Sequence, residues 1–237
     1  KRSAVLHAIG REVGGAAFRA YDFKKQNGFL ESNRLAAERG LYRQIYCGCE
    51  FSLRHREPFR MVLLGLGYRG EIYARWALAH PQDVQVTAIA EPDPRKCRVW
   101  AERLSLPAEA VFSDWSEAVA AADAEAAVIA LPDRLHFPAA MQALARGLHL
   151  LLEKPVGATW EECVVLDAAV RESGRLVQIG HILRFTPYYM KIAEWIRSGA
   201  LGELVSIRHL EPVGFHKAAM AFCRGTWGDT RRSTPMI

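Results

Sequence analysis

Six residues with three glycines, Gly65-Leu-Gly-Tyr-Arg-Gly70, constrain the fold of this chain more than any other segment. They follow an apolar run at 60–65 and begin a helical pattern. A G-x-G-x-x-G between a strand and a helix is typical of a loop that binds a dinucleotide. Gly65 permits a tight turn, Gly67 leaves room for a pyrophosphate, and Gly70 lets the helix pack closely on the strand. A glycine turn without a ligand is the alternative.

The helix after the glycine loop is predicted to hold the pyrophosphate through its free N–H groups, with Tyr68 and Arg69 among the contacts. Glu91 ends the second predicted strand, where a carboxylate accepts hydrogen bonds from the adenosine ribose hydroxyls. Because a carboxylate there repels a 2′-phosphate, NAD is favoured over NADP. Arg95 and Lys96 lie nearby in the sequence and could bind a 2′-phosphate, so NADP remains the alternative cofactor.

Short apolar runs alternate with helical patterns over residues 58–178, which predicts a parallel sheet with right-handed crossovers. The chain is therefore assigned to the α/β class, with a Rossmann-type parallel sheet at 58–178. Residues 1–57 are predicted to be a helical segment with a Cys-x-Cys loop, and 179–237 the start of an α+β substrate domain. The expected strands are 60–65, 84–90, 126–131, 148–152, 175–180 and 203–210. The expected helices lie near 70–80, 94–104, 115–122, 134–146, 159–173 and 187–198.

The charge of the chain is unevenly distributed. Residues 1–57 carry 11 Lys and Arg against 6 Asp and Glu, a net +5, whereas residues 58–237 carry 20 of each and are neutral. This asymmetry indicates two parts with different histories. The basic segment could contact RNA, but a solvated surface is the favoured interpretation.

The composition is that of an ordinary globular protein, with 50% hydrophobic and 24% charged residues. No apolar run is long enough for a membrane helix, and the chain begins with Lys1 and without a signal-peptide pattern. A cytoplasmic protein without a membrane partner, incomplete at its start, is expected. The five cysteines, an odd number, argue against a disulfide framework.

Glu153-Lys-Pro155 follows the fifth predicted strand, at the edge of the sheet where such folds bind ligands. Lys154 could direct its ammonium group at a substrate hydroxyl or at a nicotinamide. On spacing alone, Lys154 is equally well explained as an exposed surface lysine.

Four blocks together resemble the Gfo/Idh/MocA oxidoreductase family: the strand with the glycine loop, Leu131-Pro-Asp-Arg-Leu-His136, Glu153-Lys-Pro155 and Arg184-Phe-Thr-Pro187. The resemblance covers about 59–237. It implies NAD or NADP binding and hydride transfer between the nicotinamide and a carbon of a sugar or polyol. It assigns catalysis to Lys154, and cofactor contacts to Pro132, His136, Glu153, Lys154 and Arg184. Without the family, His136 would be interpreted as a surface histidine at a helix start.

Members of that family continue into a large open sheet domain that carries an Asp and a His used in proton transfer. The chain stops at Ile237, so the resemblance implies a truncated enzyme whose catalytic base lies further on. The strand at 203–210 would then present an unpaired edge, which favours association into homo-oligomers.

Cys47-Gly-Cys49 is a possible half-site for a metal or cluster, although two free loop cysteines are the simpler interpretation. The surrounding Tyr46-Cys-Gly-Cys-Glu-Phe-Ser52 resembles the C-terminal end of the epoxyqueuosine reductase family, which acts in tRNA modification. That resemblance covers about 3–54 and matches Cys47 and Cys49 to the later two of four iron–sulfur ligands. With half of the ligands present, no intact cluster is expected. An epoxyqueuosine reductase fragment with tRNA as partner, and a non-catalytic nucleotide-binding module, remain the alternative functions.

Overall fold

The computed structural model describes residues 57–210 and, beyond them, 212, 214, 215, 219, 228, 229, 233 and 234. The helical segment and the Cys47 and Cys49 half-site predicted for residues 1–57 therefore lie outside the described residues, apart from Glu57. In the described part, no helix is both long and apolar enough to cross a bilayer.

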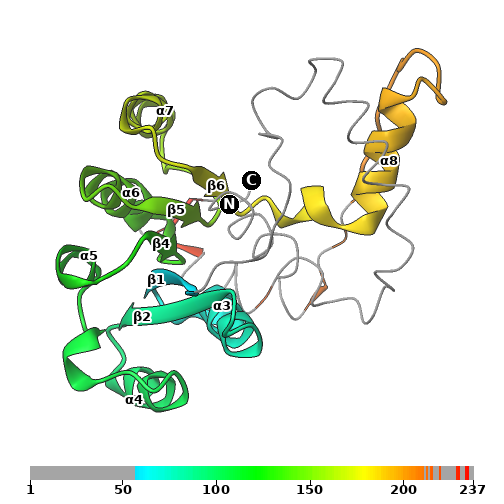
Figure 1. Cartoon of the computed structure of the whole chain (residues 1–237). Coiled ribbons are helices and arrows are strands. Elements are labelled where there is room, and N and C mark those ends of the chain that lie inside the picture. The colour runs from blue at the N-terminus through cyan, green and yellow to red at the C-terminus, as the bar shows by residue number, and fades with distance from the viewer. Residues whose placement is uncertain are drawn as a thin grey trace.

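Six parallel strands form one twisted sheet in the order β3-β2-β1-β4-β5-β6 (Figure 1). This order reverses direction between β1 and β4, as in Rossmann folds. The strands are β1 (Phe59–Leu64), β2 (Val84–Ala90), β3 (Val111–Phe112), β4 (Ala126–Ile129), β5 (His149–Leu152) and β6 (Val177–Ile179). The Rossmann-type sheet predicted from the alternating pattern is confirmed.

The strands are buried because helices cover both faces of the sheet (Figure 1). Met61 and Leu63 of β1 pack with α3 and α4 on one face, whereas Val62 and Leu64 pack with α5, α6 and α7 on the other. The helices are α3 (Tyr68–Ala79), α4 (Pro94–Arg103), α5 (Trp115–Ala121), α6 (His136–Ala145), α7 (Trp160–Ser173) and α8 (Pro187–Arg197). Short 3-10 turns lie at η2 (Ala108–Ala110), η3 (Asp133–Leu135) and η4 (Ile182–Phe185).

Side-chain caps fix where several helices begin, and hence where the loops at the strand ends stop. Asp93 accepts a hydrogen bond from the N–H of Arg95 at the start of α4. Thr159 accepts one from the N–H of Glu162 at the start of α7, while the Glu162 carboxylate accepts the N–H of Ala158. These caps use otherwise unpaired N–H groups of the first helical turn.

Two features of the sheet differ from the sequence-based expectation. The strand β3 was not predicted, because two residues are too few to produce an apolar pattern; it pairs with Ile89 and Ala90 of β2. The predicted strand at 203–210 is wrong, since the structure assigns no strand there and all its residues are exposed. An alternating pattern becomes a strand only where another strand pairs with it.

Candidate functional site

The glycine loop turns sharply from β1 into α3, and two of its glycines are required by close contacts. Gly65 has a φ of +89°, and a Cβ there would lie 2.6 Å from the carbonyl oxygen of Ala130. A Cβ on Gly70 would lie 1.8 Å from the carbonyl oxygen of Gly65. Any side chain at Gly70 would therefore push α3 away from the loop.

Gly67 is the N-cap of α3 and faces open space. A Cβ built on it meets no atom within 4 Å, and no side chain caps the helix there. Tyr68 next to it is 82% exposed. The N–H groups of this helix start, together with the positive end of the helix dipole, form a suitable site for an anion such as a pyrophosphate.

Glu91 follows β2 and is buried against the glycine loop. Its Oε2 accepts the N–H of Leu66 at 2.8 Å, and its Oε1 accepts the N–H of Asp93 at 3.1 Å. Each carboxylate oxygen has a second lone pair with which it could accept a ligand hydroxyl. The Cys97 thiol donates to the Glu91 carbonyl oxygen, and burial followed by the charge of Glu91 raises the pKa of Cys97.

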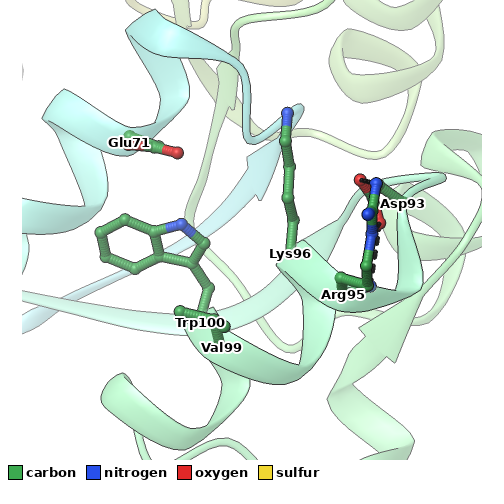
Figure 2. A pocket seen from close by; sticks show the side chains of 6 residues that line it. All are labelled: Glu71, Asp93, Arg95, Lys96, Val99 and Trp100. Carbon is green, nitrogen blue, oxygen red and sulfur yellow. Dashed lines mark hydrogen bonds and ion pairs between the residues drawn. The ribbon is translucent and has the colours of Figure 1, made fainter.

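A shallow groove of about 320 Å³ lies between α3 and α4, beside the end of β2 (Figure 2). Arg95 folds back onto Asp93, with its Nη2 at 3.1 Å from Oδ2, and this contact lowers the pKa of Asp93. Lys96 extends along the groove and has no ion-pair partner among the described residues. Of the two cations considered for a 2′-phosphate, Lys96 is thus the one not already paired. The groove is lined by Glu71, Asp93, Arg95, Lys96, Val99 and Trp100.

Glu153 follows β5 and is buried, whereas the neighbouring Lys154 is exposed. The Glu153 Oε1 accepts hydrogen bonds from the Arg69 Nε at 2.7 Å and the Tyr73 hydroxyl at 2.6 Å. Its Oε2 lies 3.3 Å from the backbone nitrogen of Lys154, which donates to it. The Arg69 side chain thus contacts Glu153, and Tyr73 is a site residue that the sequence patterns did not indicate.

His136 begins α6 and is only 1% exposed, so the alternative of a surface histidine is wrong. Its Nδ1 lies 2.6 Å from the carbonyl oxygen of Pro155, and its Nε2 lies 2.8 Å from that of Leu131. Both ring nitrogens therefore face backbone oxygens, and the ring connects the loops after β4 and β5. The cofactor contact that the family resemblance implies for His136 stays a prediction. Pro132, four residues earlier in the chain, is exposed.

Arg184 lies on η4, beyond β6, and is exposed. It is close enough to His181 for its positive charge, after burial, to lower the pKa of that histidine, an effect that the Glu153 carboxylate partly offsets. Arg184 and Glu153 therefore act on the same histidine from different strand ends.

Asp133 was not predicted as a site residue, yet it is 1% exposed at the end of β4. Its Oδ2 accepts hydrogen bonds from the backbone N–H and the hydroxyl of Thr234. Its Oδ1 has no hydrogen-bond partner among the described residues. Asp133 and Thr234 are 101 positions apart in the sequence, which explains why no local sequence pattern revealed this contact.

A family model described as "Oxidoreductase family, NAD-binding Rossmann fold" matches residues 59–181, just over half of the 237 residues. The chain belongs to this family. A second model, described as "Epoxyqueuosine reductase QueH", matches residues 1–55. The resemblances noted in both parts of the sequence are thus confirmed.

Similar curated proteins are about twice as long as the matched region. Inositol 2-dehydrogenase 4 of Saccharopolyspora erythraea is 32% identical over 171 residues, which is 69% of this chain and 49% of that protein. Rhizopine catabolism protein MocA of Rhizobium meliloti is 34% identical over 149 residues, 62% of this chain and 44% of that protein. The chain therefore spans about half the length of the curated relatives it matches.

Solved structures show the same fold. Scyllo-inositol dehydrogenase from Lactobacillus casei, in a crystal structure with bound NAD(H) and scyllo-inositol, is 25% identical with a TM-score of 0.58. The match covers 62% of this chain and 43% of that one. Myo-inositol 2-dehydrogenase from Lactobacillus plantarum is 22% identical with a TM-score of 0.59, covering 63% and 44% of the two chains.

Gly67 and Gly70 of the glycine loop should respond differently to an added methyl group. Gly70→Ala should lower the free energy of unfolding by about 3 kcal/mol, because the new Cβ would overlap the backbone of Gly65. Gly67→Ala should cost less than about 1 kcal/mol, because its Cβ would enter open space. Urea unfolding of both variants measures the difference. Equal losses would show that the packing of α3 on the loop is not tight.

Proposed function

We propose that this chain binds NAD across the carboxyl ends of β1, β2, β4 and β5. In this proposal it supplies the cofactor half of an oxidoreductase that acts on a sugar or an inositol-like polyol. The observation that carries the proposal is a pair of neighbouring groups. The start of α3 at Gly67 faces open space, and the Glu91 carboxylate is held beside it by a hydrogen bond from the N–H of Leu66. One group suits a phosphate and the other a ribose hydroxyl, on adjacent strands.

The residues at the other end of the site suit the nicotinamide side of the cofactor. When bound, NAD supplies a ring carbon that accepts or returns a hydride. Lys154 is exposed beside the buried Glu153, so its ammonium group can donate to a hydroxyl of the nicotinamide ribose or of the substrate. We assign to Lys154 the orientation of that hydroxyl, to Pro132 and Arg184 contacts around it, and to His136 the placement of the loops.

The proposed substrate class follows from the relatives. Several are named inositol 2-dehydrogenases, and one solved relative contains scyllo-inositol together with NAD(H). A polyol ring offers neighbouring hydroxyl groups, which suit a lysine donor such as Lys154. Activity with a polyol is proposed for the protein to which this region belongs.

NAD is the proposed cofactor rather than NADP. The Glu91 carboxylate lies where the adenosine ribose would bind, and a negative charge there disfavours a 2′-phosphate. Arg95, which could have offset that charge, is paired with Asp93. Of these two cations, Lys96 is left to bind a 2′-phosphate. We expect Lys96 to be the source of any affinity for NADP.

A second function is proposed for a separate part of the chain. We propose the division into 1–57, 58–178 and 179–237. The match of residues 1–55 to epoxyqueuosine reductase supports its first boundary, with the first part derived from a tRNA-modification enzyme. Cys47 and Cys49 would supply two of the four thiolates that an iron–sulfur cluster requires.

The purified chain should contain no intact cluster, because two thiolates are half of the required ligand set. Iron analysis and the visible absorption spectrum of anaerobically purified protein measure this. Stoichiometric iron that is lost in Cys47→Ser would show that the ligand set is completed in another way.

The 237-residue chain should bind NAD in calorimetry, and Gly67→Asp should abolish the binding. The new carboxylate would occupy the phosphate approach with a like charge, and should weaken binding by more than about 100-fold. Circular dichroism of the variant controls for folding. A folded wild-type chain that binds no NAD would overturn the proposal.

Cofactor choice should depend on Glu91 and Lys96 in opposite directions. Glu91→Gln should weaken NAD binding and narrow the preference for NAD over NADP by about tenfold, because the repulsion of the 2′-phosphate is lost. Lys96→Met should weaken NADP and leave NAD unchanged. The dissociation constants of both cofactors, measured by calorimetry, test this. Equal wild-type affinities for the two would contradict the assignment of NAD.

A further inference from the structure

A largely buried polar cluster connects the start of α3 with the loop after β5, at opposite ends of the proposed site. It consists of Arg69 and Tyr73 on α3, and Glu153 after β5. The Arg69 Nε and the Tyr73 hydroxyl both donate to the Glu153 Oε1, and the Arg69 Nη2 lies 3.3 Å from the Tyr73 oxygen. The three groups therefore form a closed set of hydrogen bonds.

The charges and protons of the cluster are balanced internally. The Arg69 side chain is 25% exposed and that of Glu153 is 8% exposed, so the ion pair is largely shielded from water. Burial, and then the charge of Glu153, raises the pKa of Tyr73 well above its usual range. The Tyr73 hydroxyl thus stays protonated and remains a donor. Arg69, although it belongs to the glycine loop motif, has its guanidinium engaged with Glu153.

The cluster crosses the end of a strand. Glu153 follows β5, α3 follows β1, and β4 lies between these two strands in the sheet. The hydrogen bonds therefore pass over the carboxyl end of β4, at the point where the strand order reverses. Gly180, which follows β6, packs against the Glu153 carboxylate: a Cβ on it would lie 3.1 Å from that group.

Glu153 passes this restraint to its neighbour. With Oε1 held by α3, the Glu153 Oε2 accepts the backbone N–H of Lys154 at 3.3 Å. The carboxylate therefore fixes the backbone from which the Lys154 side chain extends. A change in the position of the α3 start would move the Glu153 carboxylate, and the carboxylate would in turn move the backbone of Lys154.

We propose that Arg69 and Tyr73 are positioning residues, which set the placement of Lys154 through the Glu153 carboxylate and couple it to the phosphate end of the site. The proposal rests on the proposed function for the identity of the phosphate end. The alternative is that the cluster only stabilises the fold. A loss of stability cannot distinguish the two roles, because breaking any buried polar network lowers stability. The test therefore needs a readout at Lys154 itself.

The test compares Tyr73→Phe with the wild-type 237-residue chain. An amine-acylating reagent is applied at several pH values, and mass spectrometry follows the modification rate of Lys154 relative to that of Lys191 on α8. Loss of the Tyr73 donor should change this ratio about two- to tenfold, the range for one lost hydrogen bond. Saturating NAD should protect Lys154 in the wild type, and less so in Tyr73→Phe.

Two further variants separate positioning from stability. Ala77→Gly, on the same helix but without a contact to Glu153 among those described, should lower the melting temperature and leave the Lys154 ratio unchanged. Glu153→Gln should shift the ratio, and adding Tyr73→Phe to it should have little further effect, because both act through one carboxylate.

The outcomes distinguish this proposal from the proposed function. An unchanged Lys154 ratio in Tyr73→Phe, or additive effects in the double variant, would overturn the positioning role. A wild-type chain that fails to bind NAD would overturn the proposed function instead, and the ratio without cofactor would still decide the role of Tyr73.

Discussion

The close approach of Gly70 to the carbonyl group of Gly65 is the contact on which the rest of the site depends. Because no side chain separates them, α3 begins directly above the end of β1. This places the uncapped helix start at Gly67 next to open space, and it brings the N–H of Leu66 within 2.8 Å of Glu91. Arg69 and Tyr73 lie in the first turns of the same helix, from which both reach Glu153.

Buried carboxylates occupy the ends of three strands, and each is stabilised by different donors. Glu91 after β2 accepts backbone N–H groups, and Glu153 after β5 accepts Arg69 and Tyr73. Asp133 after β4 accepts groups of Thr234. An unpaired buried carboxylate is strongly unfavourable, so these contacts restrain the loops that carry them. The loops form the surface on which a Rossmann fold binds its ligand.

The structure shows partners for two motif residues that the sequence did not indicate. Arg69 and His136 both belong to family motifs and were expected to contact a cofactor. In the structure, the Arg69 guanidinium contacts Glu153, and both ring nitrogens of His136 face backbone oxygens. The motifs therefore indicated which residues gather at the strand ends, but not which partners their side chains have there. Those partners lie about 80 residues away for Arg69 and in the neighbouring loops for His136.

The sequence by itself determined the class of fold, five of the six strands and the glycine loop, because each depends on local features such as apolar runs and residues without a Cβ. It also indicated both families, whose short motifs are local. Only the tertiary structure decided the strand β3, the loss of the expected strand at 203–210, the role of Tyr73 and the contact of Asp133 with Thr234. Three of these depend on segments that are distant in the sequence and meet only when the sheet has formed, whereas residues 203–210 form no strand because no other strand among the described residues pairs with them.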